Sequence, residues 1–422
     1  MHRIQNYATL AHTPARHDAL DIIEAGLAAI DTTAIMRDQV TLEGEVLRIG
    51  YHTFTLSDYR SIRVIGFGKA SCQAAAALEK ILGPRITSGI AISNATVSAS
   101  ICATITLCES SHPLPTQQNV TNSGAIVALC ESLTTDDLVI VLVSGGGSAM
   151  LCWPASECEQ GARLYHAANK KGLTIQQLNT VRKHISLLKG GGLAKLLYPA
   201  TVAGIIFSDV PGNNPEMVAS GPTYPDISTI ADAQRIITEE DLGDFTLIET
   251  PKEHHWFERV TNIVLVSNQT ALEAMAATAE RLGYATSIIA SDMYDDPETL
   301  VAKFHALAQP HTVILGGGES RLTIAESHGK GGRNQHVALT ALAGLKDGHL
   351  FASIASDGHD NGESAGGLVD TATAVRARAG GIDCERERSI FNDYPVLEAS
   401  HDLVFTGTTG ANVSDLMMLL AP

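Results

Sequence analysis

The stretch DLVIVLVSGGGS at residues 137–148 decides the fold class of this protein. Residues 138–143 form an apolar run without polar alternation, and a serine and three glycines follow it. Such a run predicts a parallel β-strand that is covered on both faces. Because ligands in open parallel sheets bind beyond the carboxyl ends of the strands, the residues after this run are candidates for a binding site.

Outward from this stretch, β-rich runs of the same kind alternate with Ala-rich helical stretches. The alternation predicts an α/β fold with mainly parallel strands. The further runs are SIRVIGF (61–67), SGIAISN (88–94), ATITLCE (103–109), ATVAGIIFSD (200–209), NIVLVSN (262–268), ATSIIAS (285–291), HTVILGGG (311–318) and FASIASDG (351–358).

The length predicts two domains, because 422 residues exceed what one hydrophobic core usually supports. The least apolar stretch lies at residues 238–259, where the chain is charged, carries Pro251 and precedes a new βα series. We therefore place the boundary there and expect an N-terminal domain at residues 1–250 and a C-terminal domain at residues 251–422.

The composition is that of a globular protein with an acidic surface: 45% of the residues are apolar, 18% are charged, and the net charge is −17. This charge argues against nucleic acid or an anionic membrane as a partner, and an anionic substrate would need a local basic pocket. The seven cysteines include no C-x-x-C pair, which favours reduced thiols over a zinc site. No signal-peptide pattern or membrane-length apolar run is present, so we expect a cytoplasmic location.

A first glycine-rich loop follows the strand predicted at residues 61–67. Gly66 and Gly68 let backbone amides approach an anion, the following helix adds partial positive charge, and Lys69 adds a full charge. The P-loop pattern is absent, Ser71 replaces the third glycine of a dinucleotide fingerprint, and no acidic residue ends the next strand. The loop is therefore either an anion site or a tight turn with an exposed lysine.

A second loop consists of Ser144, Gly145, Gly146, Gly147 and Ser148. Successive glycine amides at a strand end form a nest that suits phosphate. Three consecutive glycines also cost chain entropy, which makes a simple turn a poor explanation.

A basic segment follows at residues 179–192. Asn179, Arg182, Ser186 and Lys189 are three or four residues apart, so on one helix they share a face. In an acidic protein this face either meets an anion or is solvated.

The second predicted domain has three glycine-rich loops, at residues 316–319, 329–336 and 406–412, the last before a predicted C-terminal helix. Arg333 lies at the start of another predicted helix, where the helix dipole disfavours a cation unless an anion is present.

Three carboxylates follow predicted strands. Asp209 could bind Mg²⁺ or accept a hydroxyl proton, and Asp357 and Asp360 have a spacing that suits Mg²⁺ on phosphates. The alternative is that these residues stabilise turns. We interpret the isolated histidines, His112 among them, as structural or substrate-contacting rather than metal-binding.

Together these clusters resemble the glycerate 2-kinase family that ends in a MOFRL-type C-terminal domain. The motifs that carry the resemblance are GFGKAS (66–71), SSHPLP (110–115), SGGGSA (144–149), LNTVRKHISLLKGGGLA (178–194), SDVPGNNP (208–215), SGPT (220–223), GGGES (316–320), GKGGRNQ (329–335), SDGHDN (356–361) and TGTTGANVSDL (406–416). Two positions depart from the family pattern: Gly192, where an arginine is frequent, and Asn361, where a glycine is frequent.

The resemblance implies an α/β protein with a Rossmann-like parallel-sheet domain, a smaller second α/β domain, and an active site in the cleft between them. It implies transfer of the γ-phosphoryl group of ATP to the 2-hydroxyl of D-glycerate, giving 2-phosphoglycerate, and it suggests Lys69 and Arg333 as the catalytic pair. With the carboxylates above, we expect catalysis by Lys69, Arg333 and Asp209, and Mg²⁺ at Asp357 and Asp360.

The residues expected to bind the nucleotide come from the glycine-rich loops and the basic segment. They are Gly66, Gly68, Ser144, Gly145, Gly146, Gly147, Ser148, Asn179, Arg182, Lys189, Gly317, Gly318, Glu319, Gly331, Gly332, Thr408 and Asn412. Glycerate is the expected small-molecule partner, and we expect a monomer or a homodimer.

Two other functions compete with the kinase. Some members of the family carry a hydroxypyruvate reductase label, which would make this protein an NAD(P)H-dependent oxidoreductase. The absence of a ribose-binding carboxylate and the Lys/Arg pair in glycine-rich loops favour the kinase. A sensor of nucleotides or sugar acids without catalysis is the other alternative.

Overall fold

The computed structural model describes residues 2–94, 101–210, 212, 214–322 and 328–422. Pro211 and Asn213 of the motif at 208–215 lie outside the described residues. The chain forms two compact units. We call Ile35–Ser208 with Asn214–Leu265 the N-terminal unit, and Met1–Ala34 with Asp209–Asn213 and Val266–Pro422 the C-terminal unit.

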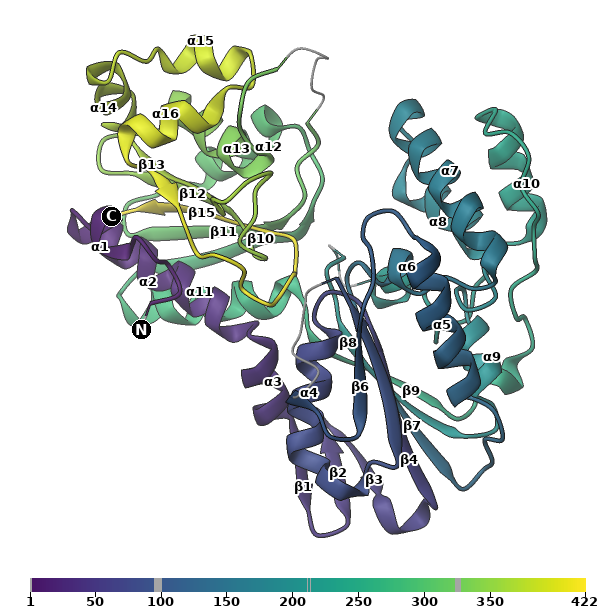
Figure 1. The fold of residues 1–422 in the computed structure, drawn as a ribbon. Helices are drawn as coiled ribbons and strands as arrows, with labels where there is room; N and C mark the ends of the chain where they lie inside the picture. Colours follow the sequence, from purple (N-terminus) through teal and green to yellow (C-terminus); the bar gives the residue numbers. More distant parts are fainter. Residues whose placement is uncertain (1, 95–100, 211, 213, 323–327) are drawn as a thin grey trace. The chain divides into compact units, whose positions relative to one another are not determined.

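The N-terminal unit is built on a six-stranded sheet in the order β6-β5-β4-β7-β8-β9 (Figure 1). The strands are β4 (Ser61–Phe67), β5 (Ser88–Ser93), β6 (Ile105–Glu109), β7 (Asp137–Ser144), β8 (Thr201–Phe207) and β9 (Val260–Val266). From β6 to β8 all neighbours pair in parallel, and every residue of β7 is buried. The parallel, doubly covered strand predicted at residues 138–143 is therefore confirmed.

Helices and a small sheet complete this unit. They are α3 (Thr32–Gln39), α4 (Ser71–Leu82), α5 (Gln117–Leu129), α6 (Gly147–Met150), α7 (Ala155–Lys171), α8 (Ile175–Lys183), α9 (Gly192–Leu197) and α10 (Ile230–Glu239), with β1 (Val40–Glu43), β2 (Val46–Ile49) and β3 (His52–Thr55) in antiparallel order. α4 follows directly after the loop that contains Lys69, as the sequence predicts.

The sheet of the C-terminal unit has the order β10-β11-β15-β12-β13-β14. Its strands are β10 (Ala285–Met293), β11 (Thr312–Gly318), β12 (Leu350–Ala355), β13 (Gly366–Asp370), β14 (Leu403–Val404) and β15 (Asp415–Ala421). Only β10 and β11 pair in parallel, so this sheet is mixed.

The predicted C-terminal helix is wrong, because the chain ends in β15. This strand lies between β11 and β12 and is buried throughout. An apolar run as short as DLMMLLA can form either a buried helix or a buried strand. Here it forms a strand because it pairs with both β11 and β12.

The helices of this unit are α1 (Tyr7–Leu10), α2 (Pro14–Ala29), α11 (Asn268–Arg281), α12 (Pro297–Leu307), α13 (Arg333–Ala341), α14 (Thr373–Ala379), α15 (Cys384–Ser389) and α16 (Asp393–Ser400). α2 packs along α11, where Gly26 faces Met275 (Figure 1). The buried Arg16 of α2 also donates to Asp370 and Asp402, at 2.7 Å each. These contacts explain why the first residues of the chain belong to the unit that contains its end.

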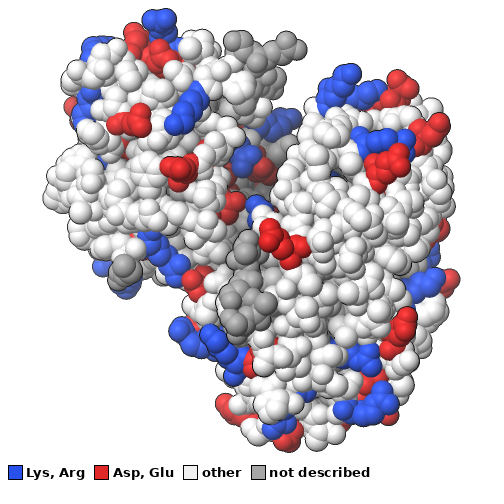
Figure 2. Space-filling view, viewed as in Figure 1, with Lys and Arg blue, Asp and Glu red and all other residues white. Residues whose placement is uncertain are grey.

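Among the described helices, none has the length and apolar character needed to cross a membrane. Figure 2 shows basic and acidic side chains interspersed on the visible face, with wide uncharged areas between them.

Candidate active site

The two glycine-rich loops of the N-terminal unit lie against each other at the carboxyl ends of β4 and β7. The Lys69 N–H donates to the Gly145 carbonyl at 2.8 Å, and the Ala70 N–H donates to Ser144 Oγ at 3.0 Å. Gly68 has a φ of +115°, and a Cβ at this position would collide with Ser144. The structure thus brings the two predicted anion-binding loops together.

Gly146 lies between the side chains of His112 and Lys69. A Cβ at Gly146 would lie 3.2 Å from His112 Cδ2 and 3.3 Å from Lys69 Cγ, and the glycine itself has a φ of +80°. Burial, together with the positive charges of Lys69 and Arg182, lowers the pKa of His112 to about 4. His112 is therefore a neutral imidazole at neutral pH. In the sequence, the motif at residues 110–115 was the signal that placed His112 among the site candidates.

A chain of polar side chains leads from the second loop to Arg182. Ser148 Oγ and Ser220 Oγ are 2.9 Å apart, the Ser220 hydroxyl donates to Asn179 Oδ1 at 3.1 Å, and Arg182 Nη1 donates to the same oxygen at 3.0 Å. The structure therefore groups Ser148, Asn179 and Arg182, all expected from the sequence, around Ser220, which had no assigned role.

Lys189 occupies a different place from the rest of the basic segment. Its side chain is fully buried, forms an ion pair with Glu157 and donates to the Leu151 carbonyl at 2.5 Å. α8 ends at Lys183, so the prediction of one helical face that runs from Asn179 to Lys189 is wrong. The ion pair gives Lys189 a structural role in addition to its predicted role in nucleotide binding.

In the C-terminal unit, Arg333 is held by two carboxylates at the ends of β11 and β15. Arg333 Nε donates to Asp415 Oδ2 at 2.8 Å, and Nη1 donates to Glu319 Oε1 at 2.6 Å. These negative charges raise the pKa of Arg333 further, although its burial acts in the opposite direction. Burial raises the pKa of Asp415 to about 6 against the attraction of Arg333. Asp415 is a site residue that the sequence analysis missed.

Asp360 supplies the anion at the start of α13. Its Oδ1 and Oδ2 accept the backbone N–H groups of Asn334 and Gln335, at 3.0 and 2.8 Å. The side chain is buried, and burial raises the pKa of this carboxyl group. The sequence analysis expected an anion near Arg333, and the carboxylate of Asp360 is such an anion within the protein itself.

The remaining carboxylates lie near these residues in the same unit. Asp357 Oδ1 accepts the His359 N–H at 3.0 Å, and the Asp209 carbonyl accepts the Ser414 hydroxyl at 2.6 Å. Across the described ranges, no group of three or more His, Cys, Asp or Glu side chains is arranged to hold a metal ion.

The loop at residues 406–412 packs on the loop at residues 356–361. Thr408 Oγ1 lies 2.8 Å from His359 Nε2, and Asn412 Oδ1 accepts the Ser414 N–H at 3.2 Å. The expected glycines lie at the edges of the Arg333 cluster: Gly317 and Gly318 end β11, and Gly331 and Gly332 precede α13.

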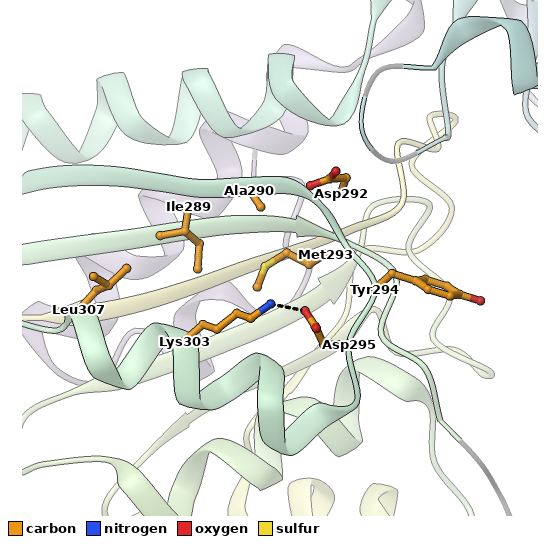
Figure 3. Close-up of a pocket in the computed structure, with 8 residues that line it drawn as sticks. All are labelled: Ile289, Ala290, Asp292, Met293, Tyr294, Asp295, Lys303 and Leu307. Atoms are coloured by element: carbon orange, nitrogen blue, oxygen red, sulfur yellow. Dashed lines mark hydrogen bonds and ion pairs between the residues drawn. The ribbon is translucent and has the colours of Figure 1, made fainter.

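A cavity of about 520 Å³ lies between the end of β10 and α12 (Figure 3). Apolar side chains such as Ile289 and Met293 line it beside the ion pair of Lys303 and Asp295, whose atoms are 2.5 Å apart. The Glu319 N–H donates to the Met293 carbonyl at 2.8 Å, so the cavity adjoins the Arg333 cluster. No residue of its lining was expected from the sequence.

Polar and cationic side chains at strand ends in two α/β units define an enzyme of the type that handles small anionic substrates. Two family models match the chain: "Domain of unknown function (DUF4147)" over residues 18–250, which is more than half of the chain, and "MOFRL family" over residues 312–415. The chain therefore belongs to the glycerate 2-kinase family with a MOFRL region.

The similarity to known relatives extends over nearly the whole length of this chain. A protein of Pyrococcus horikoshii named glycerate 2-kinase is 30% identical, over 95% of this chain and 98% of its own. A protein of Agrobacterium vitis, provisionally named hydroxypyruvate reductase, is 35% identical over 85% of this chain and 86% of its own. The crystal structure of a glycerate kinase from Thermotoga maritima has a TM-score of 0.82 at 27% identity and covers 96% of this chain and 99% of that one.

Proposed function

We propose that this protein is a D-glycerate 2-kinase, which transfers the γ-phosphoryl group of ATP to the 2-hydroxyl of D-glycerate. The observation that carries the proposal is the site around Gly146, where Lys69 lies at a nest of glycine amides in an otherwise acidic protein. Phosphoryl transfer depends mainly on positioning and on neutralising charge around the phosphates, and these groups can do both.

In this proposal Lys69 stabilises the charge on the transferred phosphoryl group, and the amides of residues 144–148 orient the phosphates. Arg333 is the second residue proposed for catalysis. Its partner Glu319 is 46% exposed whereas Asp415 is 3% exposed, so Glu319 is the partner that a phosphate can replace. Asp415 then keeps the guanidinium oriented.

Asp209 is the proposed base. Its carboxylate accepts the proton of the 2-hydroxyl, the hydroxyl oxygen forms a bond to the γ-phosphorus, and the bond from that phosphorus to the bridging oxygen breaks, releasing ADP. The hydrogen bond that the Ser414 hydroxyl donates to the Asp209 carbonyl holds the backbone at this position.

Mg²⁺ would neutralise part of the phosphate charge when bound. Of the two carboxylates proposed for it, Asp357 fits better. Both oxygens of Asp360 already accept N–H groups at the start of α13, and a metal ion would compete with that cap. Asp357 is therefore the first metal ligand to test.

The reductase is the second candidate, and the provisional name of the Agrobacterium relatives is what favours it. A dinucleotide-binding strand next to the first glycine loop normally ends in an acidic residue that binds ribose. Here β5 ends at Ser93, whose hydroxyl donates to the Lys69 carbonyl at 3.1 Å. The end of β5 at a serine, where a ribose-binding carboxylate would be expected, supports the kinase.

The test combines the protein with ATP, Mg²⁺ and either enantiomer of glycerate, and assigns the product by phosphorus NMR. We expect 2-phosphoglycerate from D-glycerate. A phosphate on the 3-hydroxyl, or turnover of neither enantiomer, contradicts the proposal. In a parallel sample with hydroxypyruvate and NADH, we expect no loss of NADH absorbance. A cytoplasmic location, a monomeric or homodimeric state and the absence of a nucleic-acid partner stay predictions.

A further inference from the structure

We infer that Arg182, with the hydroxyls of Ser148 and Ser220 and the imidazole of His112, forms the binding site for the carboxylate end of the acceptor acid. The sequence assigned Arg182, Asn179 and Ser148 to the nucleotide. The inference rests on the proposed function for the identity of the acid, and its geometry lies entirely within the N-terminal unit.

The first argument is the charge of Arg182. Its guanidinium donates to the neutral amide oxygen of Asn179, and within the described part of the chain it has no carboxylate at ion-pair distance. The charge of Glu157 acts to raise the pKa of Arg182, but Glu157 is itself paired with Lys189. Burial accordingly lowers the pKa of Arg182 to about 10, so the side chain stays charged without a neutralising partner. A half-buried cation without an ion-pair partner is stabilised by an anionic ligand.

Arg333 shows the contrast. There the carboxylates of Asp415 and Glu319 raise the pKa of the guanidinium, and they already neutralise it within the fold. Of the two arginines, Arg182 is the one whose charge is left for a ligand.

The second argument is the way that neutral groups are arranged around Arg182. Asn179 Oδ1 accepts from both Arg182 and Ser220, which fixes the guanidinium relative to the serine hydroxyls. A serine hydroxyl can both donate and accept, so Ser148 and Ser220 suit the hydroxyl groups of the acid.

The backbone around Ser220 is held in an unusual conformation. Ala219 and Ser220 have φ values of +51° and +62°, which side-chain-bearing residues rarely adopt. A Cβ at Gly147 would lie 2.7 Å from the Ala219 Cβ, so this strained turn is pressed against the second glycine-rich loop. Strain of this kind persists where the surrounding structure enforces it, and it is common at ligand sites.

The third argument separates a carboxylate from a polyphosphate. His112 is neutral, so it adds hydrogen-bonding capacity but no charge. Lys69 is the neighbouring cation, and the proposed function assigns it to the phosphoryl group, which leaves Arg182 with the neutral groups for one carboxylate and its neighbouring hydroxyls. A planar guanidinium also binds a carboxylate through two parallel hydrogen bonds, which a lysine cannot reproduce.

The test measures the KM values for D-glycerate and for ATP in the variants Arg182→Lys and Ser220→Ala. We expect the KM for D-glycerate to rise at least about tenfold in Arg182→Lys, with the KM for ATP changed by less than about twofold. The control is Arg163→Lys, because Arg163 packs on Phe245 in the same unit, and it should leave both values unchanged. A rise confined to the KM for ATP overturns the inference and assigns the site to the nucleotide.

Calorimetry without ATP separates this inference from the proposed kinase. D-glycerate should bind the wild type and lose affinity in Arg182→Lys, whereas glycerol, which lacks the carboxylate, should bind neither. If the wild type binds D-glycerate through Arg182 but shows no kinase activity, the site stands and the proposed function fails. If the kinase is active and Arg182→Lys and Ser220→Ala, both folded by circular dichroism, bind D-glycerate like the wild type, the inference is wrong. Ser220→Ala alone decides the question should Arg182→Lys fail to fold.

Discussion

At the scale of single residues, the two arginines of the candidate site differ in how their charge is neutralised. Arg333 is bound by Glu319 and Asp415, whereas Arg182 is bound by the amide of Asn179. The two proposals therefore give the same residue type two tasks: Arg333 would exchange an internal carboxylate for a phosphate, and Arg182 would offer its charge to a ligand.

Lys69 is the residue whose replacement should cost the most activity. Lys69→Ala removes a contact made to the transferred group, so we expect a loss of about 3–5 kcal/mol of transition-state stabilisation, a hundredfold or more in turnover. The KM for D-glycerate should change less, because the contact does not serve ground-state binding. Steady-state kinetics under saturating ATP measure both values.

The matched control for Lys69 is the exposed Lys80 of α4, and Lys80→Ala should keep wild-type turnover. If Lys69 and Arg333 act on one phosphoryl group, the double variant Lys69→Ala, Arg333→Ala should lose far less than the sum of the single losses. Turnover of a correctly folded Lys69→Ala close to that of the wild type would remove Lys69 from the mechanism.

His112 should make stability depend on pH. Its folded pKa of about 4 lies below the ordinary value of 6.5, so between these values the unfolded chain binds more protons than the folded protein. Stability therefore rises with pH across this window, by about 1 kcal/mol from this residue, because solvent screens a side chain that is exposed. Urea unfolding of the wild type and of His112→Gln at several pH values measures the contribution as a difference. Parallel stability curves for the two proteins would show that His112 titrates normally.

At the scale of secondary-structure elements, the site residues occupy the ends of strands and the starts of helices. Lys69 lies between β4 and α4, Ser148 lies in the short α6 just after β7, and Arg333 begins α13. Such positions expose backbone amides that have no partner within the element. The protein either satisfies these amides with its own carboxylate, as at α13, or leaves them near the ligand.

The cap of α13 separates a structural role of Asp360 from a metal-binding role. Asp360→Asn removes the charge that faces two backbone N–H groups, so we expect a lower melting temperature, equivalent to about 1–2 kcal/mol. The Mg²⁺ concentration for half-maximal activity should stay the same, whereas Asp357→Asn should raise it. Calorimetric melting and Mg²⁺ titrations measure the two effects. A raised Mg²⁺ requirement in Asp360→Asn with an unchanged melting temperature would make Asp360 a metal ligand after all.

At the scale of the whole molecule, the chain begins and ends in the same unit. Residues up to Ala34 pack with the C-terminal unit, and Arg16 of α2 is bound to Asp402, 386 positions away in the sequence. Asp402 also accepts from Arg376, at 2.8 Å, which places this buried network beneath α14. Long-range pairs of this kind hold the N-terminal helices on the unit.

Arg16→Leu should therefore destabilise the protein strongly. It leaves two carboxylates without one of their cationic partners inside the fold, and we expect a loss of about 3–5 kcal/mol in the free energy of unfolding. The control Arg235→Leu breaks an exposed pair with Glu239 and should cost less than about 1 kcal/mol. Urea titrations followed by circular dichroism give both values. Equal effects of the two substitutions would show that the Arg16 network is not stabilising.

From the sequence alone, the apolar runs predicted β4 to β12 and the loops that follow them. The run at residues 138–143 and its neighbours are apolar because each strand is covered on both faces, and this pattern is visible without any knowledge of the partners. The glycine-rich loops after β4 and β7 can likewise be recognised in the sequence, because their backbone geometry excludes other residues. Lys69, Arg182 and Arg333 could therefore be proposed from local sequence, whereas the boundary at residue 250 stays a prediction.

Only the tertiary structure decided how each charge is used. Lys189 and Arg182 belong to one basic segment, yet Lys189 is neutralised by Glu157 and Arg182 is not, because the end of α8 turns the chain between them. The final apolar run became β15 through pairing with β11 and β12. Partners of buried charges come from distant parts of the chain, and no periodicity encodes them. The physical reason is that local conformation depends on neighbours in sequence, whereas desolvation and ion pairing depend on neighbours in space.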